Sequence, residues 1–485
     1  MKILLVNPNF HSGGPENIVG TLPPLGLLYI GGSLIKGGYS DIELIDLNTN
    51  ETDLKNDSDI GEYITKKNPT ILFIGGMAST ASLSRSIAIS QKIKEINNEI
   101  KIVLGGTHPT FMYKEIMENH PCIDFIIRGE GELTCQKLID CLVKNLDIAQ
   151  VKGLVWRNPK NGGDTYIVND ENSEIADLDE FSPAWNLIKN WEYYRAPANN
   201  EITATFQFSR GCNHRCIFCG QWQLWKKWHS RSVKSLVDEV EFLYTHYGVT
   251  FFFWADENPA QDQNKWIEVL NGLKTINDKY NNKFHHMLNT RVDHVIRDEK
   301  YLPLYREAGI FAIDLGMESA IQQRLNYFNK KTTTDLNKRS LELLRSHDII
   351  SIVQVLIGSP DETMESLQKT GLIFQEWNPD LMHLMHFYFT TPFPWTEFGK
   401  SMEDKIVEPD YSKWDYRHPI IKPDGISLEQ LSKMSKWIKL EFNYNPKKIL
   451  DIMQIDDDYR QKFLINSIIQ SLKYRSGNSK LSVCE

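Results

Sequence analysis

The sequence predicts an α/β fold: a parallel sheet covered by helices, then a partial (β/α)6 barrel, then a helical C-terminal region. Two series of alternating strand and helix patterns predict the sheet and the barrel, and an irregular stretch separates them. Three closely spaced cysteines directly after the first strand of the second series mark a site. The predicted boundaries are 1–140 for the sheet domain, 141–197 for a connector, 198–400 for the barrel and 401–485 for the helical region.

The first 140 residues contain short apolar runs that end in glycine, proline or polar residues. The predicted strands are residues 3–6, 42–46, 70–74, 101–104 and 125–127. Helical patterns lie between them, most clearly from Ser82 to Ile96. Strands that alternate with helices in this way form a parallel sheet, and such sheets bind ligands beyond the carboxyl ends of their strands. The glycine-rich turns of this region fall at those ends.

A second series of strand patterns begins after the irregular stretch. The predicted strands are residues 203–208, 250–255, 284–289, 311–315, 351–357 and 381–389. Helical patterns separate them, for instance over residues 235–246 and 335–346. These units predict a partial barrel, whose chemistry is expected at the carboxyl ends of its strands. The tail from about residue 400 is first aromatic-rich and then helical, without strand patterns.

Composition excludes several classes of protein. The chain has 485 residues, with 54 Lys and Arg against 63 Asp and Glu, a formal net charge of −9. A net acidic chain without a block of basic residues argues against nucleic acid or an anionic membrane as the main partner. No apolar run reaches about 18 residues, so no membrane span is expected, and the start is too short for a secretory signal. We expect a cytoplasmic protein.

Three of the seven cysteines, Cys212, Cys216 and Cys219, lie within eight residues. Three thiolates from one short loop can ligate three corners of a [4Fe–4S] cluster and leave the fourth iron open for a small molecule. A structural zinc site, with His214 or His229 as fourth ligand, is the main alternative. The position after the first barrel strand favours catalysis.

The pattern Cys-x-x-x-Cys-x-aromatic-Cys after the first strand of a partial barrel resembles the radical S-adenosylmethionine superfamily. The resemblance implies that Cys212, Cys216 and Cys219 hold the cluster and that the methionine amine and carboxylate of S-adenosylmethionine chelate the fourth iron. Phe218 is expected beside the adenine, and Gly220 in the same cofactor-binding loop. Reductive cleavage would give a 5′-deoxyadenosyl radical, with an electron donor such as a flavodoxin or a ferredoxin.

The same resemblance implies cofactor contacts at later strand ends, although each residue could instead be an ordinary turn or surface residue. Asp256 and Glu257 suit the ammonium of S-adenosylmethionine, and Arg291, after Asn289, could pair with its carboxylate. The remaining expected contacts are Glu318 and Ser319 for the ribose hydroxyls, and Gln354 and Gly358 on the strand that resembles the adenine edge.

The N-terminal sheet resembles the Rossmann-like cobalamin-binding module found in one branch of this superfamily. The expected cofactor contacts are Asn9, His11, Ser12, Gly13, Gly14, Gly105, Gly106, Thr107, His108, Gly129, Glu130, Gly131 and Glu132. A nicotinamide or flavin site is the alternative, but no Gly-x-Gly-x-x-Gly follows the first strand. The Asp-x-His-x-x-Gly signature is absent, so we expect neither His11 nor His108 to be a cobalt ligand. A solvent-facing or phosphate-binding role is expected for both.

Longer segments resemble the anaerobic magnesium-protoporphyrin IX monomethyl ester oxidative cyclases, from about residue 3 to 425. They are residues 9–14, 110–113, 289–292, 328–333, 377–380 and 410–414. That family closes the isocyclic ring of chlorophyll precursors without dioxygen, with the new oxygen taken from water. Asn258, the turn Ser359-Pro360 and a short tail depart from the family pattern, and these departures concern the substrate rather than the cofactors.

Aromatic residues near the site have two interpretations. The stretch from Phe387 to Trp395, and Trp222, Trp225 and Trp228 after the cysteines, could stack on a planar macrocycle or could pack the fold. The leading interpretation is a cobalamin-dependent radical enzyme that oxidises a small-molecule substrate, a tetrapyrrole. The alternatives are a methyltransferase with the same cofactors, acting on an unactivated carbon or phosphorus, and a non-catalytic zinc or iron–sulfur regulator.

Overall fold

A computed structural model describes residues 1–10, 19–49, 54, 56–76, 79–158, 165–172, 175, 177–378, 383–443 and 450–475. The expected contacts His11, Ser12, Gly13 and Gly14 lie outside the described residues. The chain forms two compact units. The sheet unit contains Met1–Ser12, Pro24–Tyr193 and Asp410–Asp415, and the barrel unit contains Gly13–Pro23, Tyr194–Pro409 and Tyr416–Glu485.

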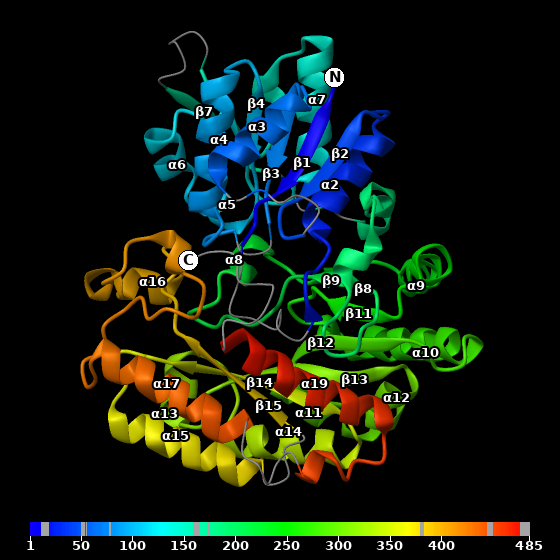
Figure 1. The fold of residues 1–485 in the computed structure, drawn as a ribbon, viewed down its shortest axis with the longest axis vertical. Coiled ribbons are helices and arrows are strands. Elements are labelled where there is room, and N and C mark those ends of the chain that lie inside the picture. Colours follow the sequence, from blue (N-terminus) through cyan, green and yellow to red (C-terminus); the bar gives the residue numbers. More distant parts are fainter. Residues whose placement is uncertain are drawn as a thin grey trace. The chain divides into compact units, whose positions relative to one another are not determined.

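A seven-stranded sheet forms the centre of the sheet unit (Figure 1). Its strands are β1 (Ile3–Asn7), β2 (Ile42–Asp46), β3 (Ile71–Ile74), β4 (Lys101–Leu104), β5 (Phe125–Ile127), β6 (Leu154–Arg157) and β7 (Tyr166–Val168). The order is β2-β1-β3-β4-β5-β6-β7, and β1 to β5 run parallel. The chain changes direction across the sheet between β1 and β3, which is where such sheets bind ligands.

The helices of the sheet unit connect these strands. They are α2 (Leu25–Lys36), α3 (Asp57–Lys66), α4 (Leu83–Ile96), α5 (Thr107–Phe111), α6 (Tyr113–Asn119) and α7 (Glu132–Lys144). Strands β1, β3 and β4 are almost entirely buried, as expected of a parallel sheet covered on both faces. The five predicted strands and the helix over Ser82–Ile96 are confirmed within a few residues.

The region after α7 contains more regular structure than the connector that the sequence predicts. Strands β6 and β7 pair antiparallel with β5 and with each other, and they extend the sheet. Both strands are short, and most of the residues between them lie outside the described ranges. The segment between the two strands, residues 158–165, is shorter than the helical connections of the parallel strands, and β7 is partly exposed along its length. The alternation of buried strands and helices that predicted the rest of the sheet therefore did not indicate this hairpin.

Six parallel strands form the barrel unit, in the order β15-β14-β13-β12-β11-β8. They are β8 (Thr203–Phe206), β11 (Phe251–Trp254), β12 (His285–Arg291), β13 (Ile310–Glu318), β14 (Ile350–Ile357) and β15 (His383–Phe389). Each pairs in parallel with its neighbour in the sheet. The α/β fold with an open six-stranded barrel, predicted from the second strand series, is confirmed. The short strands β9 (Ser209–Arg210) and β10 (His229–Ser230) form a separate antiparallel pair.

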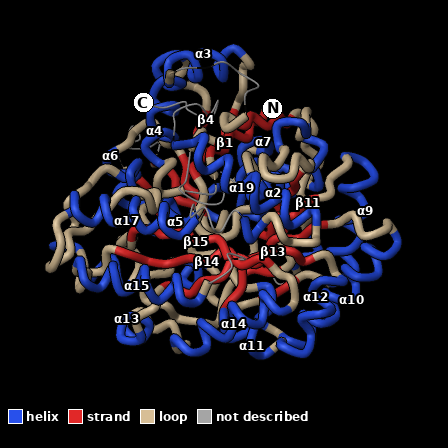
Figure 2. Tube along the Cα trace, turned by 60° about the horizontal axis from the view of Figure 1, so that its bottom comes forward, coloured by secondary structure: helices blue, strands red, loops and turns tan. Residues whose placement is uncertain are grey.

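Helices lie around the outer side of these strands (Figure 2). They are α9 (Val233–Tyr247), α10 (Gln263–Lys279), α11 (Val292–Arg297), α12 (Leu302–Glu307), α13 (Gln322–Tyr327), α14 (Thr334–Ser346) and α15 (Met364–Trp377). The short helices α8 (Gln221–Leu224) and α16 (Glu397–Ser401) follow the cysteine loop and β15, respectively. Several begin at a side-chain cap: Ser232 caps α9, Asp262 caps α10 and Thr363 forms a capping box on α15. These caps set where the outer helices start.

The C-terminal region contributes to the barrel core. Its described helices are α17 (Leu428–Asn443) and α19 (Asp458–Arg475). Phe463 and Leu464 of α19 are fully buried in one cluster with Phe251, Phe311 and other residues near the starts of the barrel strands. Burial of one such side chain stabilises the fold by about 1.5–3 kcal/mol, so α19 is part of the barrel's structure.

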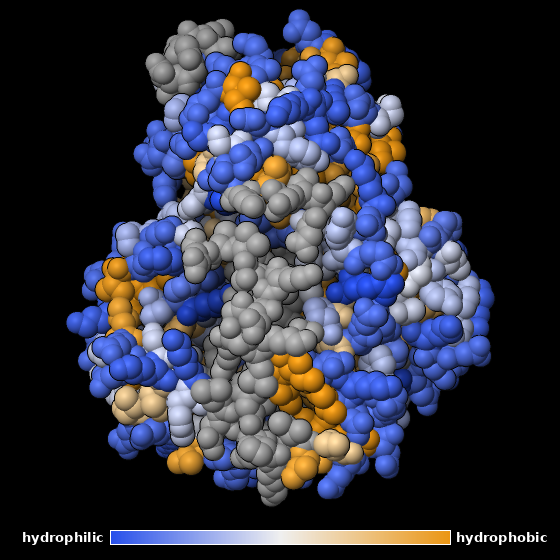
Figure 3. Space-filling model, viewed as in Figure 1, coloured by the Kyte–Doolittle hydropathy of each residue, from blue (hydrophilic) through white to orange (hydrophobic). Residues whose placement is uncertain are grey.

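The face in Figure 3 is mainly hydrophilic, with hydrophobic residues in small groups. Within the described part of the chain, no helix combines the length and the apolar character that crossing a membrane requires.

Candidate active site

The three clustered cysteines lie in the loop that follows β8 and β9, at the carboxyl end of the first barrel strand. Cys216 is buried, and Cys212 and Cys219 are partly exposed. Glycine is required at Gly220, directly after the third cysteine, because a Cβ atom there would lie 2.2 Å from Nε1 of Trp395. The loop therefore packs against the aromatic segment that follows β15.

Polar donors surround the three sulfur atoms. Nδ2 of Asn258 lies 3.7 Å from Sγ of Cys212, and Nη1 of Arg291 lies 3.9 Å from Sγ of Cys216. The backbone N–H groups of Gln221 and Trp222 donate to the sulfur of Cys219, while burial raises the pKa of this thiol to about 12. A desolvated thiol with such donors fits a metal-bound thiolate, because the metal displaces the proton and the donors stabilise the remaining charge.

The spacing of the sulfur atoms distinguishes a cluster from a single metal ion. Zinc–sulfur bonds of about 2.3 Å place the thiolates of a tetrahedral site about 3.8 Å apart. All three cysteines belong to the described residues, and their sulfur atoms do not all lie within 4.8 Å of one another. The donor set thus fits a larger iron–sulfur cluster better than the zinc site considered from the sequence.

Three tryptophans after the cysteines brace this loop. Nε1 of Trp222 donates to the carbonyl of Cys216 (3.1 Å), that of Trp225 to Glu257 Oε1 (2.9 Å), and that of Trp228 to the carbonyl of Asn258 (3.0 Å). All three rings are partly exposed. Their indole N–H groups therefore connect the cysteine loop to itself and to the segment after β11, a role that the sequence did not indicate.

Asp256 and Glu257 hold the start of the same loop. The buried carboxylate of Asp256 accepts hydrogen bonds from the backbone N–H groups of Phe208 and Ser209 and from the Ser209 hydroxyl. Glu257 accepts from the N–H of Gly211 (3.1 Å) as well as from Trp225. Burial raises the pKa of Asp256 to about 7 and that of Glu257 above its usual value. Contact of either with the ammonium of S-adenosylmethionine stays a prediction.

Arg291 lies at the centre of the polar network after β12. Its Nε donates to Asp293 (2.8 Å), its Nη2 to the carbonyl of Lys330 (2.6 Å), and its Nη1 lies beside Cys216. The nearby Asn289 amide approaches the carbonyls of Trp254 and Asp256, both at 3.4 Å. The guanidinium is buried next to the cysteine loop, where a negative charge would be attracted.

A buried ion pair, Lys330 Nζ to Glu318 Oε1 at 2.7 Å, lies at the end of β13. Glu318 has φ of +64°, a left-handed backbone that is uncommon for a residue with a side chain. The next residue, Ser319, is buried, and its hydroxyl accepts from the N–H of Ile321. The ion pair and the strained backbone fix these side chains at the strand end.

The remaining expected contacts lie around β14 and the cysteine loop. Nε2 of Gln354 donates to the buried Asp314 (2.8 Å). The N–H of Gly358 donates to Glu362 (3.0 Å). Phe218 packs edge-on against Phe328, with ring centroids 5.3 Å apart. Gly358 directly follows β14, Gln354 lies within it and Phe218 lies in the cysteine loop, and their roles toward a cofactor stay predictions.

The turns that follow the strands of the sheet unit contain more glycine backbone and fewer charged side chains than those of the barrel unit. Oδ1 of Asn9 accepts from Arg85 Nε (3.0 Å). Gly106, before Thr107 at the start of α5, has φ of +110° and ψ of −177°, a conformation that essentially only glycine adopts. His108 is fully buried, and its Nδ1 lies 3.2 Å from the Thr80 hydroxyl. The expected solvent-facing position of His108 is therefore wrong, because its ring is buried inside the unit, where burial also lowers its pKa to about 4. The phosphate-binding role considered as the alternative stays a prediction.

The turn from Gly129 to Glu132 leads from β5 into α7. Gly129 lies against the side chain of Asn172, and Gly131 against Ile30. The carboxylate of Glu130 accepts from the N–H of Ile175, and the carbonyl of Glu132 accepts from the Ser33 hydroxyl (2.7 Å). These residues are held by the sheet unit itself, and their contact with a cofactor stays a prediction.

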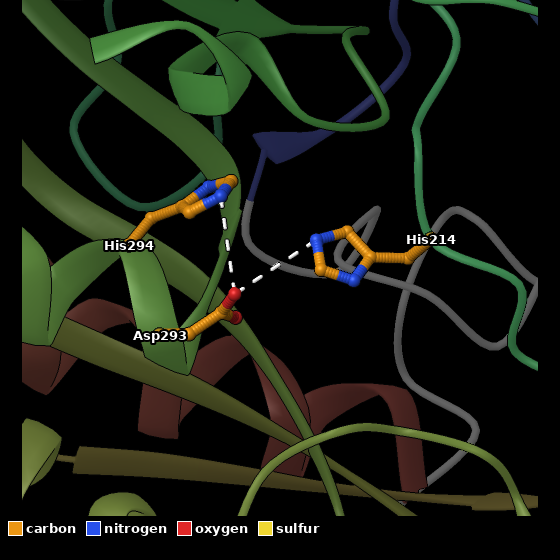
Figure 4. Close-up of side chains that lie close together, drawn as sticks. All are labelled: His214, Asp293 and His294. Carbon is orange, nitrogen blue, oxygen red and sulfur yellow. Dashed lines mark ion pairs between the residues drawn. The ribbon is translucent and has the colours of Figure 1, made fainter.

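Sequence reasoning also missed a group of ligand atoms beside the cysteine loop. His214 lies close to Asp293 and His294, which follow Arg291 at the start of α11 (Figure 4). The adjacent Asp293-His294 pair at a strand end was the available signal, but its proximity to His214 depends on the barrel's strand order.

Comparisons with known protein families agree with both units. Residues 16–139 match the B12 binding domain, and residues 206–371 match the radical SAM superfamily. These matches confirm the predicted cofactors: cobalamin, a [4Fe–4S] cluster and S-adenosylmethionine. The chain is a radical S-adenosylmethionine enzyme, so the alternative of a non-catalytic regulator is wrong.

Known proteins resemble the chain over almost its whole length. It is 35% identical over 480 residues to the anaerobic magnesium-protoporphyrin IX monomethyl ester cyclase of Rubrivivax gelatinosus, covering 98% of this chain and 82% of the relative. The hopanoid C-3 methylase of Methylococcus capsulatus is 24% identical over 82% of this chain and 72% of its own length. Among solved structures, the chain resembles the radical S-adenosylmethionine methyltransferase TsrM of Kitasatospora setae, with cobalamin and a [4Fe–4S] cluster bound. The TM-score is 0.69 at 15% identity, and the match covers 99% of this chain and all of that one. This similarity shows a shared fold. The chain therefore belongs to the cobalamin-binding radical S-adenosylmethionine enzymes, in the family of the anaerobic magnesium-protoporphyrin IX monomethyl ester cyclases.

Proposed function

We propose that this enzyme is an oxidative cyclase that acts on magnesium-protoporphyrin IX monomethyl ester or a closely similar tetrapyrrole. One observation carries the proposal: the 35% identity to a cyclase spans 98% of the chain and includes both domains. The identity to the hopanoid methylase is 24% over a smaller share. A reduced flavodoxin or ferredoxin would supply the electrons.

The proposed cluster ligands are Cys212, Cys216 and Cys219. When bound, the reduced cluster and S-adenosylmethionine supply a radical that removes hydrogen from an unactivated carbon, and cobalamin supplies a second redox centre. The chain's own residues would position these groups and exclude water. Asn258 and Arg291 place donors within 4 Å of two of the sulfurs, which supports this assignment.

Residues at the barrel's strand ends would bind S-adenosylmethionine. Arg291 would pair with the methionine carboxylate, because its buried guanidinium lies beside Cys216. Glu318, fixed by Lys330, and Ser319 would bind the ribose hydroxyls. The remaining proposed contacts are Asp256, Glu257, Asn289, Gln354, Gly358, Phe218 and Gly220.

Cobalamin would lie beyond the carboxyl ends of the parallel strands of the sheet unit. Gly105 and Gly106 have no side chain there, so the backbone of this turn can approach a large flat ligand. The neighbouring residues Asn9 and Thr107 and the turn 129–132 would complete the contacts.

The second candidate function is methyl transfer to an unactivated carbon or phosphorus of another metabolite. The similarity to the hopanoid methylase and the fold shared with TsrM favour it. Methylation would consume two molecules of S-adenosylmethionine, one as methyl donor and one as radical source, so it would leave S-adenosylhomocysteine.

Anaerobic turnover separates the two functions. Full-length protein reconstituted with all three cofactors would be incubated with reduced flavodoxin and magnesium-protoporphyrin IX monomethyl ester in ¹⁸O-labelled water. We expect 5′-deoxyadenosine and a ring-closed product that carries ¹⁸O, without S-adenosylhomocysteine. Formation of S-adenosylhomocysteine together with 5′-deoxyadenosine would contradict the cyclase and favour methyl transfer. The variant Cys219→Ala, which lacks a cluster ligand, is the control and should form neither nucleoside.

A further inference from the structure

Three side chains beside the cysteine loop direct ligand atoms at one point. His214 lies in the loop between Cys212 and Cys216, and Asp293 and His294 lie in the first turn of α11. Oδ2 of Asp293 is 3.8 Å from Nε2 of His214 and 4.0 Å from Nε2 of His294 (Figure 4). Within the described part of the chain, this is the single group of three His, Cys, Asp or Glu residues whose ligand atoms all lie within 4.8 Å of one another.

Direct hydrogen bonds do not explain this arrangement, because both distances exceed the hydrogen-bond range. The other carboxylate oxygen of Asp293 accepts from Nε of Arg291 (2.8 Å), so the side chain is oriented with Oδ2 toward the two imidazoles. His294 is 5% exposed, and its Nε2 is the ring nitrogen that lies toward Oδ2 of Asp293. The three ligand atoms therefore lie near one another without direct hydrogen bonds, at distances that a single bridging atom could span.

Two histidines and one carboxylate are a common ligand set for first-row divalent metal ions. Metal–ligand bonds of about 2.0–2.2 Å would bring the donors to about 3.3 Å apart, a contraction of roughly half an ångström from the distances seen here.

We propose that His214, Asp293 and His294 bind one first-row divalent metal ion, such as Zn²⁺ or Fe²⁺, that clamps the cysteine loop to the start of α11. Three protein ligands leave at least one position for water. Arg291 orients Asp293 as the outer partner of the ligand. Arg291 also lies against Cys216, so the clamp and the cluster site share one guanidinium.

Nearby positive charges repel a metal ion and limit the affinity of the site for it. Arg215, Arg291 and Lys330 act on His214, and Arg297 acts on His294. Two of these are offset by carboxylates, since Arg291 pairs with Asp293 and Lys330 with Glu318. The metal is therefore expected to be exchangeable, and a strong chelator should remove it.

Metal retention tests the proposal without any turnover. The full-length variant Cys212→Ala/Cys216→Ala/Cys219→Ala, free of corrinoid, would be titrated with Co²⁺, whose visible spectrum reports nitrogen and oxygen ligands. We expect one bound equivalent, and at least tenfold weaker binding when His294→Ala or Asp293→Asn is added. The exposed His246 on α9 supplies the matched control, since His246→Ala should bind as before. No bound Co²⁺, or equal binding by the His294→Ala, Asp293→Asn and His246→Ala forms, would overturn the proposal and leave water as the bridging group.

A second measurement uses the holoenzyme, in case the cysteine-free variant does not fold. Reconstituted wild-type protein would be loaded with Zn²⁺, freed of excess metal and analysed by mass spectrometry. We expect one zinc per chain beyond the cluster iron and the cobalt of cobalamin, and none in Asp293→Asn at unchanged iron content. Zinc below a tenth of an equivalent in the wild type would overturn the proposal. Because neither readout requires product, its failure is distinguishable from failure of the cyclase assignment.

Discussion

The strand ends of the barrel unit and those of the sheet unit are constructed from different groups. In the barrel, buried charged side chains meet: Arg291 contacts Cys216 and Asp293, and Lys330 pairs with Glu318. In the sheet unit, the corresponding turns contain glycines such as Gly106, and the buried His108 is neutral. Under the proposed function, the barrel would hold its ligands through side-chain chemistry, whereas the sheet unit would present a backbone surface to cobalamin. Substitutions in one unit should therefore affect the cluster or the binding of cobalamin separately.

The largest effect is expected from Cys216→Ala. Removal of one of three thiolates should abolish cluster assembly, because the cluster would keep only two protein ligands. Iron and sulfide analysis of the anaerobically reconstituted protein should find almost none, while cobalamin binding to the sheet unit stays unchanged. Cys141→Ala, at a partly exposed position in α7, is the control and should keep the full cluster. A Cys216→Ala protein with normal iron and sulfide would contradict the ligand assignment.

Gly106→Ala is expected to have the opposite effect, weaker binding of cobalamin with an intact cluster. Alanine in this backbone conformation is strained by about 1–3 kcal/mol, and its Cβ would lie 3.1 Å from Cβ of Ser79. We expect the affinity for cobalamin to fall about tenfold or more, with the iron–sulfur content unchanged. Fluorescence quenching by cobalamin measures the affinity.

The matched control for this substitution is Gly26→Ala. Gly26 is exposed in α2, and a Cβ atom there meets no other atom within 4 Å. Alanine should leave binding unchanged and should stabilise the helix by about 0.5–1 kcal/mol. If Gly106→Ala bound cobalamin as tightly as Gly26→Ala, the backbone of this turn would have no part in the site.

A smaller, pH-dependent effect is expected from Asp314→Asn in the barrel. Asp314 is buried, accepts one hydrogen bond from Gln354 and has no partner at Oδ1. Burial raises its pKa to about 7, so the folded protein holds a proton that the unfolded chain loses near pH 4. Its contribution to stability is therefore most favourable at low pH and falls as the pH rises through 7.

The expected size follows from the proton lost between pH 6 and 8. The wild type should lose about 1.4 kcal/mol relative to Asp314→Asn over this interval. Urea unfolding of the cluster-free chain at each pH, followed by circular dichroism, measures the difference. Asp404→Asn, at an exposed position, should track the wild type. A constant difference between wild type and Asp314→Asn would mean that Asp314 is already ionised in the folded barrel.

Features that depend on neighbouring residues in the sequence were the ones that could be predicted. Fully apolar runs such as Ile71–Ile74 and Phe251–Trp254 indicate buried strands from a few neighbouring residues alone. The parallel strands were therefore predicted nearly at their observed bounds. The cysteine triplet is likewise a local spacing. The hairpin β6–β7 was missed because the segment between its strands is shorter than the helical connections of the parallel strands and β7 is partly exposed, so it does not follow the alternation of buried strands and helices.

Long-range contacts of the site had no local signal. The proximity of His214 to Asp293 and His294, and the bond from Trp225 to Glu257, join segments that the order β12-β11-β8 brings together. A strand order can be predicted for a partial barrel, but the direction of one side chain at a strand end depends on packing. The sequence therefore left two interpretations for the tryptophans, stacking on a macrocycle or packing of the fold, and their hydrogen bonds show that they connect the loop to its surroundings.

The smallest effect is expected from Trp225→Phe, which tests this bracing directly. Phenylalanine keeps an aromatic ring beside Arg210, whose guanidinium lies 5.3 Å from the Trp225 ring, and removes only the N–H that donates to Glu257. Glu257 still accepts from Gly211, so the loss should be about 1 kcal/mol of loop stability. We expect chelators to remove cluster iron two to five times faster than from the wild type, as followed by the visible absorbance of the cluster. Trp437→Phe, at an exposed position of α17, is the matched control and should release iron at the wild-type rate. Equal rates of iron release from both variants would mean that the carboxylates and the backbone alone hold the loop. The site of the barrel would then depend on backbone contacts, as the turns of the sheet unit do, more than its side-chain contacts suggest.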